Sequence, residues 1–176
     1  SGNGLARHMG ISMNPLKAIQ KLNNPTIKFN DAGQINESYF FCTCGMGFDA
    51  HIGKLFATLK GRGFTGYAKA VLREFAQYIA QDYQLTINGE KITKNAFLIT
   101  FANASQYGNN AYIAPQANVE DGKIDVCVLK PFPVYAMPKI TYQVFAKTIP
   151  NSSYMDTYSS GNEILVERAQ EGPIHI

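Results

Sequence analysis

Residues 83–104 read YQLTINGEKITKNAFLITFANA, and this stretch decides the fold class. Asn88-Gly89 stands between two arms in which apolar and polar residues alternate, which is the strongest short signal of a β-hairpin. The second arm continues into a long apolar strand from Ala96 to Ala104, a pattern typical of a buried strand. The sequence therefore predicts a β-rich core.

Further strand patterns lie on both sides of this stretch. Residues 26–45 predict two strands around the turn Asp31-Ala32-Gly33, the second of which becomes a continuous apolar run. Residues 123–132 predict another strand after the long polar loop 105–122. The remaining predicted strands are short and lie at 161–169 and 173–176.

Three segments carry helix patterns. Residues 13–24 have Asn14 as the N-cap and Pro15 at the first helical position, where a missing N–H costs nothing. Residues 66–83 place their apolar side chains on one stripe. Residues 137–149 predict another amphipathic helix, although their β-branched residues leave a strand open. The 176 residues thus predict one α+β domain, mainly β, with a short helical entry and one or two covering helices.

The formal net charge of +3 is too small to predict nucleic-acid binding. No acidic residue occurs between Asp49 and Glu74, and this basic window is either a solvated helix face or a surface that meets an anionic partner. Three cysteines without framework spacing, and no signal peptide or apolar run of spanning length, favour a reducing cytoplasmic compartment. The basic and aromatic residues of the window are Lys54, Phe56, Lys60, Arg62, Phe64, Tyr67, Lys69 and Arg73.

The first eight residues, SGNGLARH, join a turn of small residues to the start of a helix. Such a junction presents backbone N–H groups and the positive end of the helix dipole to an anion, and phosphate is its natural ligand. Arg7, one turn into the helix, would add a bidentate phosphate donor. A Gly-Asn turn that merely caps an ordinary helix explains the same residues.

Two aspartates lie beside glycines in turn-like segments. Asp49, in CGMGFDAHI, follows a buried strand and either contacts water or a metal ion or simply caps a helix that begins near Ala50. Asp121, in ANVEDGKID, lies in a tight turn where its carboxylate and neighbouring carbonyl groups could converge on Mg²⁺. An isolated Asp-Gly pair is also common in turns that bind nothing.

In this order, the segments SGNGLARH, GMGFDA, AFLITFANASQYGNNAYIAPQA and DGKIDVCVLKPF resemble the diacylglycerol kinase catalytic family over nearly the whole chain. These are soluble, bacterial-type lipid kinases related to sphingosine and NAD kinases. The resemblance implies a Rossmann-like N-terminal domain with a G-G-D-G-T loop and a C-terminal β-sandwich-like domain. Residues 1–24 would then be a helical remnant of the nucleotide-binding domain, and residues 25–176 the β-rich lipid-binding domain, truncated before the family's D-G-E segment.

The resemblance also assigns residues to the site. The general base for the lipid hydroxyl would lie in the D-G-E segment beyond Ile176, so the chain would contain no catalytic residue and be inactive alone. Gly4 departs from the family pattern, since many members have an Asp there that joins a water and Mg²⁺ network. The ATP-binding positions would be Ser1, Asn3 and Arg7. The Mg²⁺ ligands would be Asp121 and the main-chain carbonyls of Asn118 and Lys123, with Asp49 acting through a water.

The function implied for the full-length parent is transfer of the γ-phosphate of ATP to the hydroxyl of diacylglycerol or a related lipid, with ATP and Mg²⁺ as cofactors. The implied partners are a lipid substrate at a membrane surface and the N-terminal domain of the same protein; nucleic acid is not expected, and a homodimer is allowed. The expected location is the cytoplasm, peripheral at the inner membrane surface. Two alternatives stay open: a non-catalytic lipid-binding or regulatory module of the same fold, at which Gly4 hints, and an NAD-kinase-like enzyme with a soluble substrate.

Overall fold

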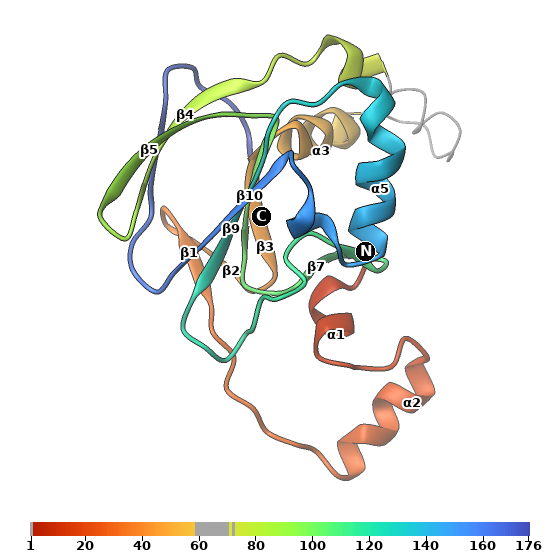
Figure 1. The fold of residues 1–176 in the computed structure, drawn as a ribbon. Helices are drawn as coiled ribbons and strands as arrows, with labels where there is room; N and C mark the ends of the chain where they lie inside the picture. The colour runs from red at the N-terminus through yellow and green to blue at the C-terminus, as the bar shows by residue number, and fades with distance from the viewer. Residues whose placement is uncertain (1, 59–70, 72) are drawn as a thin grey trace.

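A five-stranded antiparallel sheet with the order β10-β9-β6-β3-β12 forms the centre of the chain (Figure 1). The computed structural model describes residues 2–58, 71 and 73–176. All positions of β3 and β6 are buried, because these strands lie inside the sheet and are covered on both faces. The strands are β3 (Thr43–Gly47), β6 (Leu98–Ala102), β9 (Ile124–Leu129), β10 (Met155–Ser160) and β12 (Ile174–His175).

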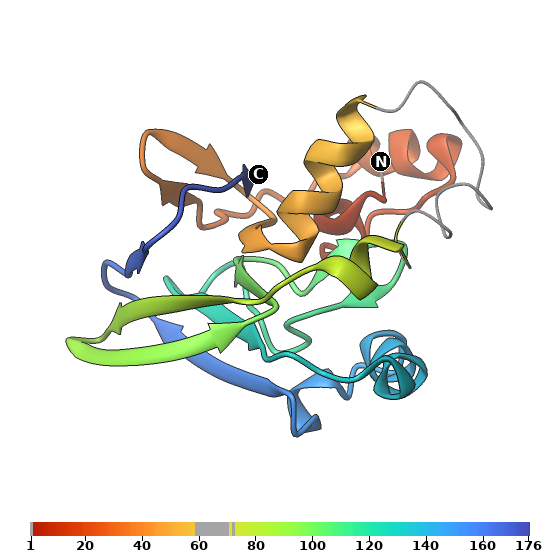
Figure 2. The same ribbon diagram turned by 90° about the horizontal axis from the view of Figure 1, so that it is seen from above.

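A second sheet of three strands packs against one face of the central sheet. Its order is β11-β4-β5, and Figure 2 shows the β4–β5 hairpin as a long pair extending from the body. Leu85 of the small sheet and Ile99 and Val126 of the central sheet meet in one cluster, each at 0% exposure. The strands are β4 (Gln81–Ile87), β5 (Glu90–Ala96) and β11 (Leu165–Arg168).

Two helices cover the other face of the central sheet, and Phe75 of the helical segment 73–77 packs there as well. Cys127 and Leu129 of β9 point away from the small sheet and pack in a second cluster with Phe48 and Ile140 from the helices. The predicted fold class, α+β and mainly β with one or two covering helices, is confirmed. The helices are α3 (Phe48–Thr58) and α5 (Met137–Phe145).

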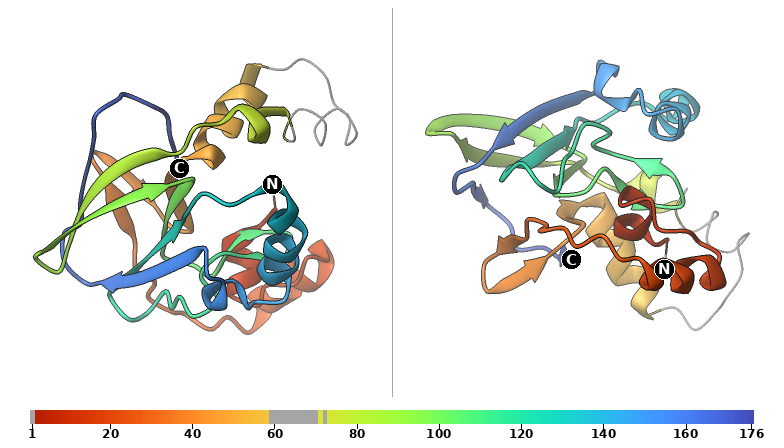
Figure 3. Two further views of the ribbon diagram at one scale, coloured as in Figure 1. Left: turned by 45° about the horizontal axis from the view of Figure 1, so that its top comes forward. Right: turned by 90° about the horizontal axis from the view of Figure 1, so that it is seen from below.

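The N-terminal residues form an arm beside this sandwich (Figure 3). The predicted helix after Asn14 is confirmed, since the Asn14 Oδ1 accepts the N–H groups of Leu16 at 3.0 Å and Lys17 at 3.3 Å. The arm consists of α1 (Gly4–His8), α2 (Pro15–Gln20), the 3₁₀ helix η1 (Lys21–Asn23) and the hairpin of β1 (Gly33–Ile35) and β2 (Ser38–Phe40).

Two predicted boundaries are wrong. The first hairpin turns at Asn36, with φ of 51°, and not at Asp31-Ala32-Gly33, while residues 25–32 form no strand. The helix predicted over 66–83 ends at residue 77, because Tyr83 already belongs to β4 and is fully buried in the sandwich. Residues 66–70 and 72 of that helix lie outside the described residues.

The long strand predicted from Ala96 to Ala104 breaks at Phe97, where the chain passes from the small sheet to the central one. The Phe97 N–H donates to the Leu129 carbonyl at 2.8 Å, and its carbonyl accepts the Phe48 N–H at 2.9 Å. The predicted loop 105–122 contains another hairpin, and β10 has no counterpart in the sequence prediction because four of its six residues are polar. That hairpin consists of β7 (Gln106–Gly108) and β8 (Ala111–Tyr112).

The segment predicted as helix or strand over 137–149 is helical in α5. It is flanked by the 3₁₀ helices η2 (Val134–Ala136) and η3 (Ile149–Asn151). In the described ranges, no helix has the length and apolar character needed to cross a membrane.

Candidate functional site

The N-terminal turn lies against the β7–β8 hairpin. The Gly2 carbonyl accepts the N–H of Asn109 at 2.9 Å, and Asn3 forms an isolated antiparallel bridge with Gly108. Asn3 has φ of 55°, a left-handed conformation that Asn tolerates better than most residues. The predicted phosphate-binding turn is thus anchored to a hairpin that lies far away along the chain.

Arg7 is held over the same hairpin. Its Nε donates to the Gly2 carbonyl at 3.1 Å, and Nη1 donates to the Asn110 Oδ1 at 3.4 Å. Because a guanidinium carries five N–H donors, this arrangement orients Arg7 without using all of them. Asn3 and Arg7 therefore contact one hairpin, whereas Ser1 lies outside the described residues.

His8 joins α1 to the residue that precedes the hairpin. The Ser105 N–H donates to Nδ1 of His8 at 3.1 Å, and the Ser105 hydroxyl lies 2.8 Å from the same nitrogen. Since Nδ1 accepts a backbone hydrogen, the imidazole is neutral with its proton on Nε2, and burial lowers the pKa of His8. Sequence reasoning missed both residues, because nothing in the sequence signals which group lies opposite His8.

Gly4 is buried where α1 meets the hairpin. A Cβ at this position would lie 2.6 Å from the Gln106 carbonyl oxygen and 2.9 Å from Sγ of Cys42. Neither atom can move easily, because one is backbone and the Cys42 thiol itself donates to the Gln106 carbonyl at 3.3 Å. Close packing therefore accounts for the glycine at the position where the family pattern has Asp.

The loop 118–123 and Asp31 form the second part of the site. The Asp31 Oδ2 accepts the Gly122 N–H at 2.6 Å, and the Asp31 N–H donates to the Val119 carbonyl at 2.7 Å. Asp31 therefore brings a second carboxylate to the loop that carries Asp121. The sequence pattern marked Asp31 only as a turn residue, since no spacing in the sequence connects it with residue 121.

The donor chemistry of this loop fits a hydrated Mg²⁺, which prefers oxygen ligands and keeps several waters. The Asp121 Oδ1 accepts the Lys123 N–H at 3.1 Å, which fixes the carboxylate at the turn. Among the residues that the structure describes, no group of three or more His, Cys, Asp or Glu side chains is placed to hold a metal. An ion here would therefore depend on main-chain oxygens and water, as the resemblance implies for Asn118 and Lys123.

Asp121→Ala should abolish the effect of Mg²⁺ on thermal stability. A ligand that binds only the folded state raises the melting temperature, so the wild-type protein should melt several degrees higher in excess Mg²⁺ than in chelator. The variant should melt at one temperature in both solutions, whereas Glu90→Ala, an exposed carboxylate on β5, should keep the wild-type difference. A wild-type melting curve that is the same with Mg²⁺ and with chelator would rule out the ion site.

Asp49 lies in the first turn of α3. Its Oδ1 accepts the Ala50 N–H at 2.7 Å, while Oδ2 is buried and has no hydrogen-bond partner among the described residues. The imidazole of His175 in β12 lies beside it, with Nδ1 4.0 Å from Oδ2. Burial raises the pKa of Asp49 to about 7, and burial lowers the pKa of His175.

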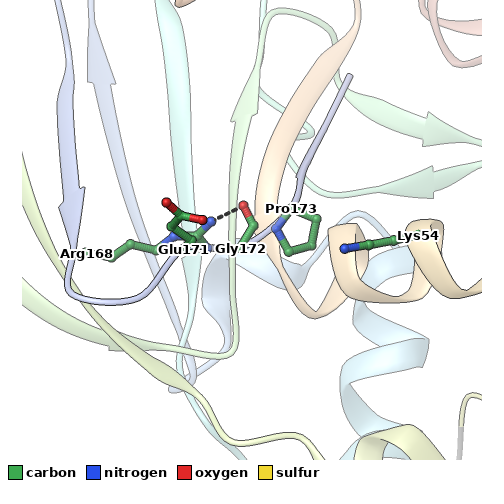
Figure 4. Close-up of a pocket in the computed structure, with 5 residues that line it drawn as sticks. All are labelled: Lys54, Arg168, Glu171, Gly172 and Pro173. Atoms are coloured by element: carbon green, nitrogen blue, oxygen red, sulfur yellow. Dashed lines mark hydrogen bonds between the residues drawn. The ribbon is translucent and has the colours of Figure 1, made fainter.

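A polar pocket of about 640 Å³ lies between α3 and the segment before β12 (Figure 4). Arg168 donates to the Gly172 carbonyl, and its Nη1 lies 3.5 Å from the Tyr83 hydroxyl, so this side chain links the segment to the small sheet. No pattern in the sequence indicates this pocket, which is lined by two cationic side chains and one carboxylate. Its lining residues are Lys54, Arg168, Glu171, Gly172 and Pro173.

The structure describes only the two ends of the basic window. Lys54 is exposed on α3, and Arg73 donates to Glu74 at 3.3 Å. Glu74 also contacts the His51 Nε2 at 2.9 Å, which ties the helical segment 73–77 to α3. The backbone of Phe56 belongs to α3, but the rest of the window lies outside the described residues: Lys60, Arg62, Phe64, Tyr67 and Lys69. Its role as a docking surface stays a prediction.

Hydrogen bonds through residues 103–105 connect the segments that carry two of the three predicted groups. The Asn103 Nδ2 donates to the Asp31 carbonyl at 2.9 Å, and Ser105, two residues later, binds His8. The short segment 103–105 thus connects α1 with the acidic loop. Asp49 lies just past the end of β3, and in the described part of the chain no hydrogen bond or ion pair joins it to the loop. Its water-mediated role at the metal stays a prediction.

The fold and the site together define the class: a sandwich-like, mainly β domain that carries a glycine-rich turn and an acidic loop beside its central sheet. The chain belongs to the family of YegS C-terminal NAD kinase beta sandwich-like domains, whose sequence profile matches residues 42–170.

Curated relatives carry kinase names. The protein named "Probable lipid kinase YegS-like" of Chromohalobacter salexigens is 24% identical over 134 residues, which are 75% of this chain and 43% of that protein. A diacylglycerol kinase of Mycobacterium tuberculosis is 27% identical over 134 residues, which are 72% of this chain and 43% of that protein. The chain therefore spans less than half the length of these relatives.

Solved structures share the fold. A diacylglycerol kinase from Bacillus anthracis superposes with a TM-score of 0.70 at 17% identity, over 98% of this chain and 54% of that chain. A second structure from the same organism gives a TM-score of 0.71 at 18% identity, over 98% of this chain and 56% of that chain. Both structures thus contain a further region outside the match.

Proposed function

We propose that the chain is the acceptor-binding part of a kinase that transfers the γ-phosphate of ATP to the hydroxyl of diacylglycerol or a related lipid. One observation carries the proposal: the segments with Arg7, Asp31 and Asp121, far apart in the sequence, are linked by hydrogen bonds through the segment 103–105, which follows β6 of the central sheet. Arg7 supplies a basic group, and Asp31 and Asp121 supply two carboxylates. Phosphoryl transfer requires groups of both kinds. The names of the curated relatives support the lipid-kinase class.

The residues present would act by positioning and charge neutralisation. Arg7, oriented by Gly2 and Asn110, would bind phosphate oxygens, and the loop with Asp31 and Asp121 would hold Mg²⁺. Bound Mg²⁺ supplies positive charge against the transferring phosphoryl group. The carboxylate that takes the proton of the lipid hydroxyl would come from the D-G-E segment that the resemblance places after Ile176.

Gly4 does not favour the non-catalytic alternative. An Asp at this position would contact the Gln106 backbone and the Cys42 thiol, so the glycine follows from how closely α1 packs on the hairpin. The second carboxylate of the site comes from Asp31, which requires no Asp at position 4. An active kinase is therefore compatible with this departure from the family pattern.

The exposed side of α2 supports contact with an N-terminal domain of the same protein. None of the α2 residues is buried. Exposed apolar side chains that lie close together mark interaction surfaces, and the relatives contain a further region outside the match. We therefore assign this surface to that domain. Its side chains are Leu16, Ile19, Leu22, Ile27 and Phe29, which are 61% to 92% exposed.

The full-length parent, incubated with radiolabelled ATP, Mg²⁺ and vesicles that contain diacylglycerol, should form labelled phosphatidic acid. Arg7→Ala should lower the rate by at least about 100-fold, because it removes a charge that stabilises the transferring phosphate, whereas Lys91→Ala, at an exposed position on β5, should not. Under the same conditions the 176-residue chain alone should give no product.

Three outcomes would contradict this account. If the parent labels no lipid with any acceptor, the non-catalytic module is favoured. If it forms labelled NADP from NAD, the NAD-kinase-like alternative is correct. Transfer by the 176-residue chain alone would show that the proposed base beyond Ile176 is not needed.

A further inference from the structure

The outer side of α5 and the preceding 3₁₀ helix η2 expose apolar and aromatic side chains. Val134, Tyr135, Tyr142 and Phe145 are 59%, 83%, 70% and 54% exposed. Tyr142 and Phe145 are three residues apart in the helix, and Pro138, also exposed, lies one turn before Tyr142, so the three share one face. We call Val134, Tyr135, Tyr142 and Phe145 the α5 outer face.

The fold does not use this face for its own core. The opposite side of the helix carries Ile140 and Gln143, which are 6% and 9% exposed. Ile140 packs with Leu129 of the central sheet in the cluster beneath α5, and Ala136 of η2 is buried there as well. The helix therefore stays attached to the sheet while its outer face remains available.

Positively charged residues flank the α5 outer face in the sequence. No acidic residue occurs between Asp125 and Asp156 in the sequence. Lys139 and Lys147 are exposed, and the Lys147 Nζ lies 4.3 Å from the centroid of the Tyr112 ring, with no carboxylate bonded to either lysine in the described ranges. The third lysine of the segment, Lys130, lies 2.9 Å from Asp156, a carboxylate that it shares with Lys94.

We propose that the α5 outer face docks on the surface of a membrane that contains anionic lipids. Aromatic side chains with a polar end favour the interface between lipid and water, and lysines beside them are attracted to anionic headgroups. A two-fold contact with a second copy would instead place the lysines of both copies near one another, and residues 126–155 contain no acid to offset them. The charges therefore favour lipid over self-association.

The inference rests on the proposed function for the lipid nature of the substrate, and it adds the surface by which the protein would reach that substrate. The surface differs from the basic window between Asp49 and Glu74, because it lies on α5 and η2. Docking needs neither ATP nor turnover. Binding and kinase activity can therefore fail independently of each other.

Cosedimentation of the full-length parent with vesicles tests the proposal in the absence of ATP. With phosphatidylcholine and phosphatidylglycerol in a ratio of about 7 to 3, Lys139→Glu/Lys147→Asn should bind at least about 10-fold more weakly than the wild type. Tyr142→Gln/Phe145→Gln should show a similar loss. Asn is chosen at position 147 because its φ is 61°, a conformation that Asn tolerates. Matched controls are Lys91→Glu and Tyr39→Gln, an exposed lysine and an exposed tyrosine elsewhere on the surface.

A tryptophan reporter gives a second measurement, since the 176 residues contain no Trp. In this chain, Phe145→Trp fluorescence should shift to shorter wavelength with the mixed vesicles and be quenched by brominated lipid, while Tyr39→Trp should not change. The proposal is overturned if the four variant and control proteins bind equally, if the Trp at position 145 does not respond, or if the α5 substitutions abolish a dimer in light scattering and leave vesicle binding intact.

Discussion

Gly4→Ala is expected to lower the free energy of unfolding by about 2 to 3 kcal/mol, the usual cost of overpacking at a tightly filled position. The added methyl group would lie 2.6 Å from the Gln106 carbonyl oxygen, so α1 must move away from the hairpin. Gly4→Asp should cost more, because it also brings a carboxylate into a buried site. Denaturant unfolding of the three proteins measures both differences.

Gly53→Ala is the matched control for this substitution. Gly53 lies inside α3, and a Cβ there meets nothing within 4 Å. The change should therefore stabilise the protein by up to about 1 kcal/mol through helix propensity alone. If Gly4→Asp retained wild-type stability and bound Mg²⁺ more tightly, the residue would be a lost metal ligand, and the packing explanation would be wrong.

Asp49→Asn is expected to stabilise the protein at pH 8, by up to about 4 kcal/mol, and to remove a pH dependence of the wild type. At pH 8 the Asp49 carboxylate is ionised although Oδ2 is buried without a hydrogen bond among the described residues. The neutral amide avoids this cost, because it carries no charge to bury beside the His175 Nδ1, which lies 4.0 Å from Oδ2.

The sign of the pH dependence follows from the pKa values. Burial raises the pKa of Asp49 to about 7, whereas its value in an unfolded chain is about 4. Between these values the folded protein binds a proton that the unfolded chain has released. The Asp49 contribution is therefore fully present below about pH 4 and is lost as the pH rises to about 7. Thermal unfolding from pH 4 to pH 8 should show a decline in the wild type that is much smaller in Asp49→Asn.

Asp156→Asn provides the opposite case. Lys94 and then Lys130 hold the pKa of Asp156 below its usual value, so its contribution is present above the unfolded pKa and is lost as the pH falls. This variant should therefore be less stable than the wild type at pH 8.

For Asp49, the contradicting result would be a dependence of stability on pH that is the same in the wild type and in Asp49→Asn. It would show that the Asp49 carboxylate does not titrate between pH 4 and pH 8.

Local chemistry made part of the fold predictable. Asn88 and Gly89 have φ of 52° and 84°, the conformation that such a hairpin turn demands, so two adjacent residues suffice to locate it. The break at Phe97 could not be predicted, because it depends on hydrogen bonds with Leu129 and Phe48 from other parts of the chain. In isolation, the continuous apolar run 96–104 favours one long strand, but packing in the core breaks that strand at Phe97.

The candidate site, like the fold, could be predicted only in part from the sequence. Arg7 and Asp121 could be selected from local motifs together with the resemblance, and hydrogen bonds through residues 103–105 connect the segments that carry them. Asp31 and His8 could not, since their roles come from the Gly122 and Ser105 backbones, which only the folded chain brings near them. Binding of ATP and Mg²⁺ at these residues stays a prediction that the Asp121→Ala and Arg7→Ala experiments test.

The strand order has a consequence for the time course of folding. The β4–β5 hairpin closes across two residues and can form within microseconds, whereas β3 must pair Thr43 with Ala102 across a segment that contains α3 and this hairpin. Non-local pairings of this kind are slow to form. The contacts of Arg7 with Asn110 and of Asp31 with Gly122 join still more distant positions. We therefore expect the candidate site to form after β3 has paired with β6, whereas the edge strand β12, which pairs Ile174 with Met46, joins over a longer span still.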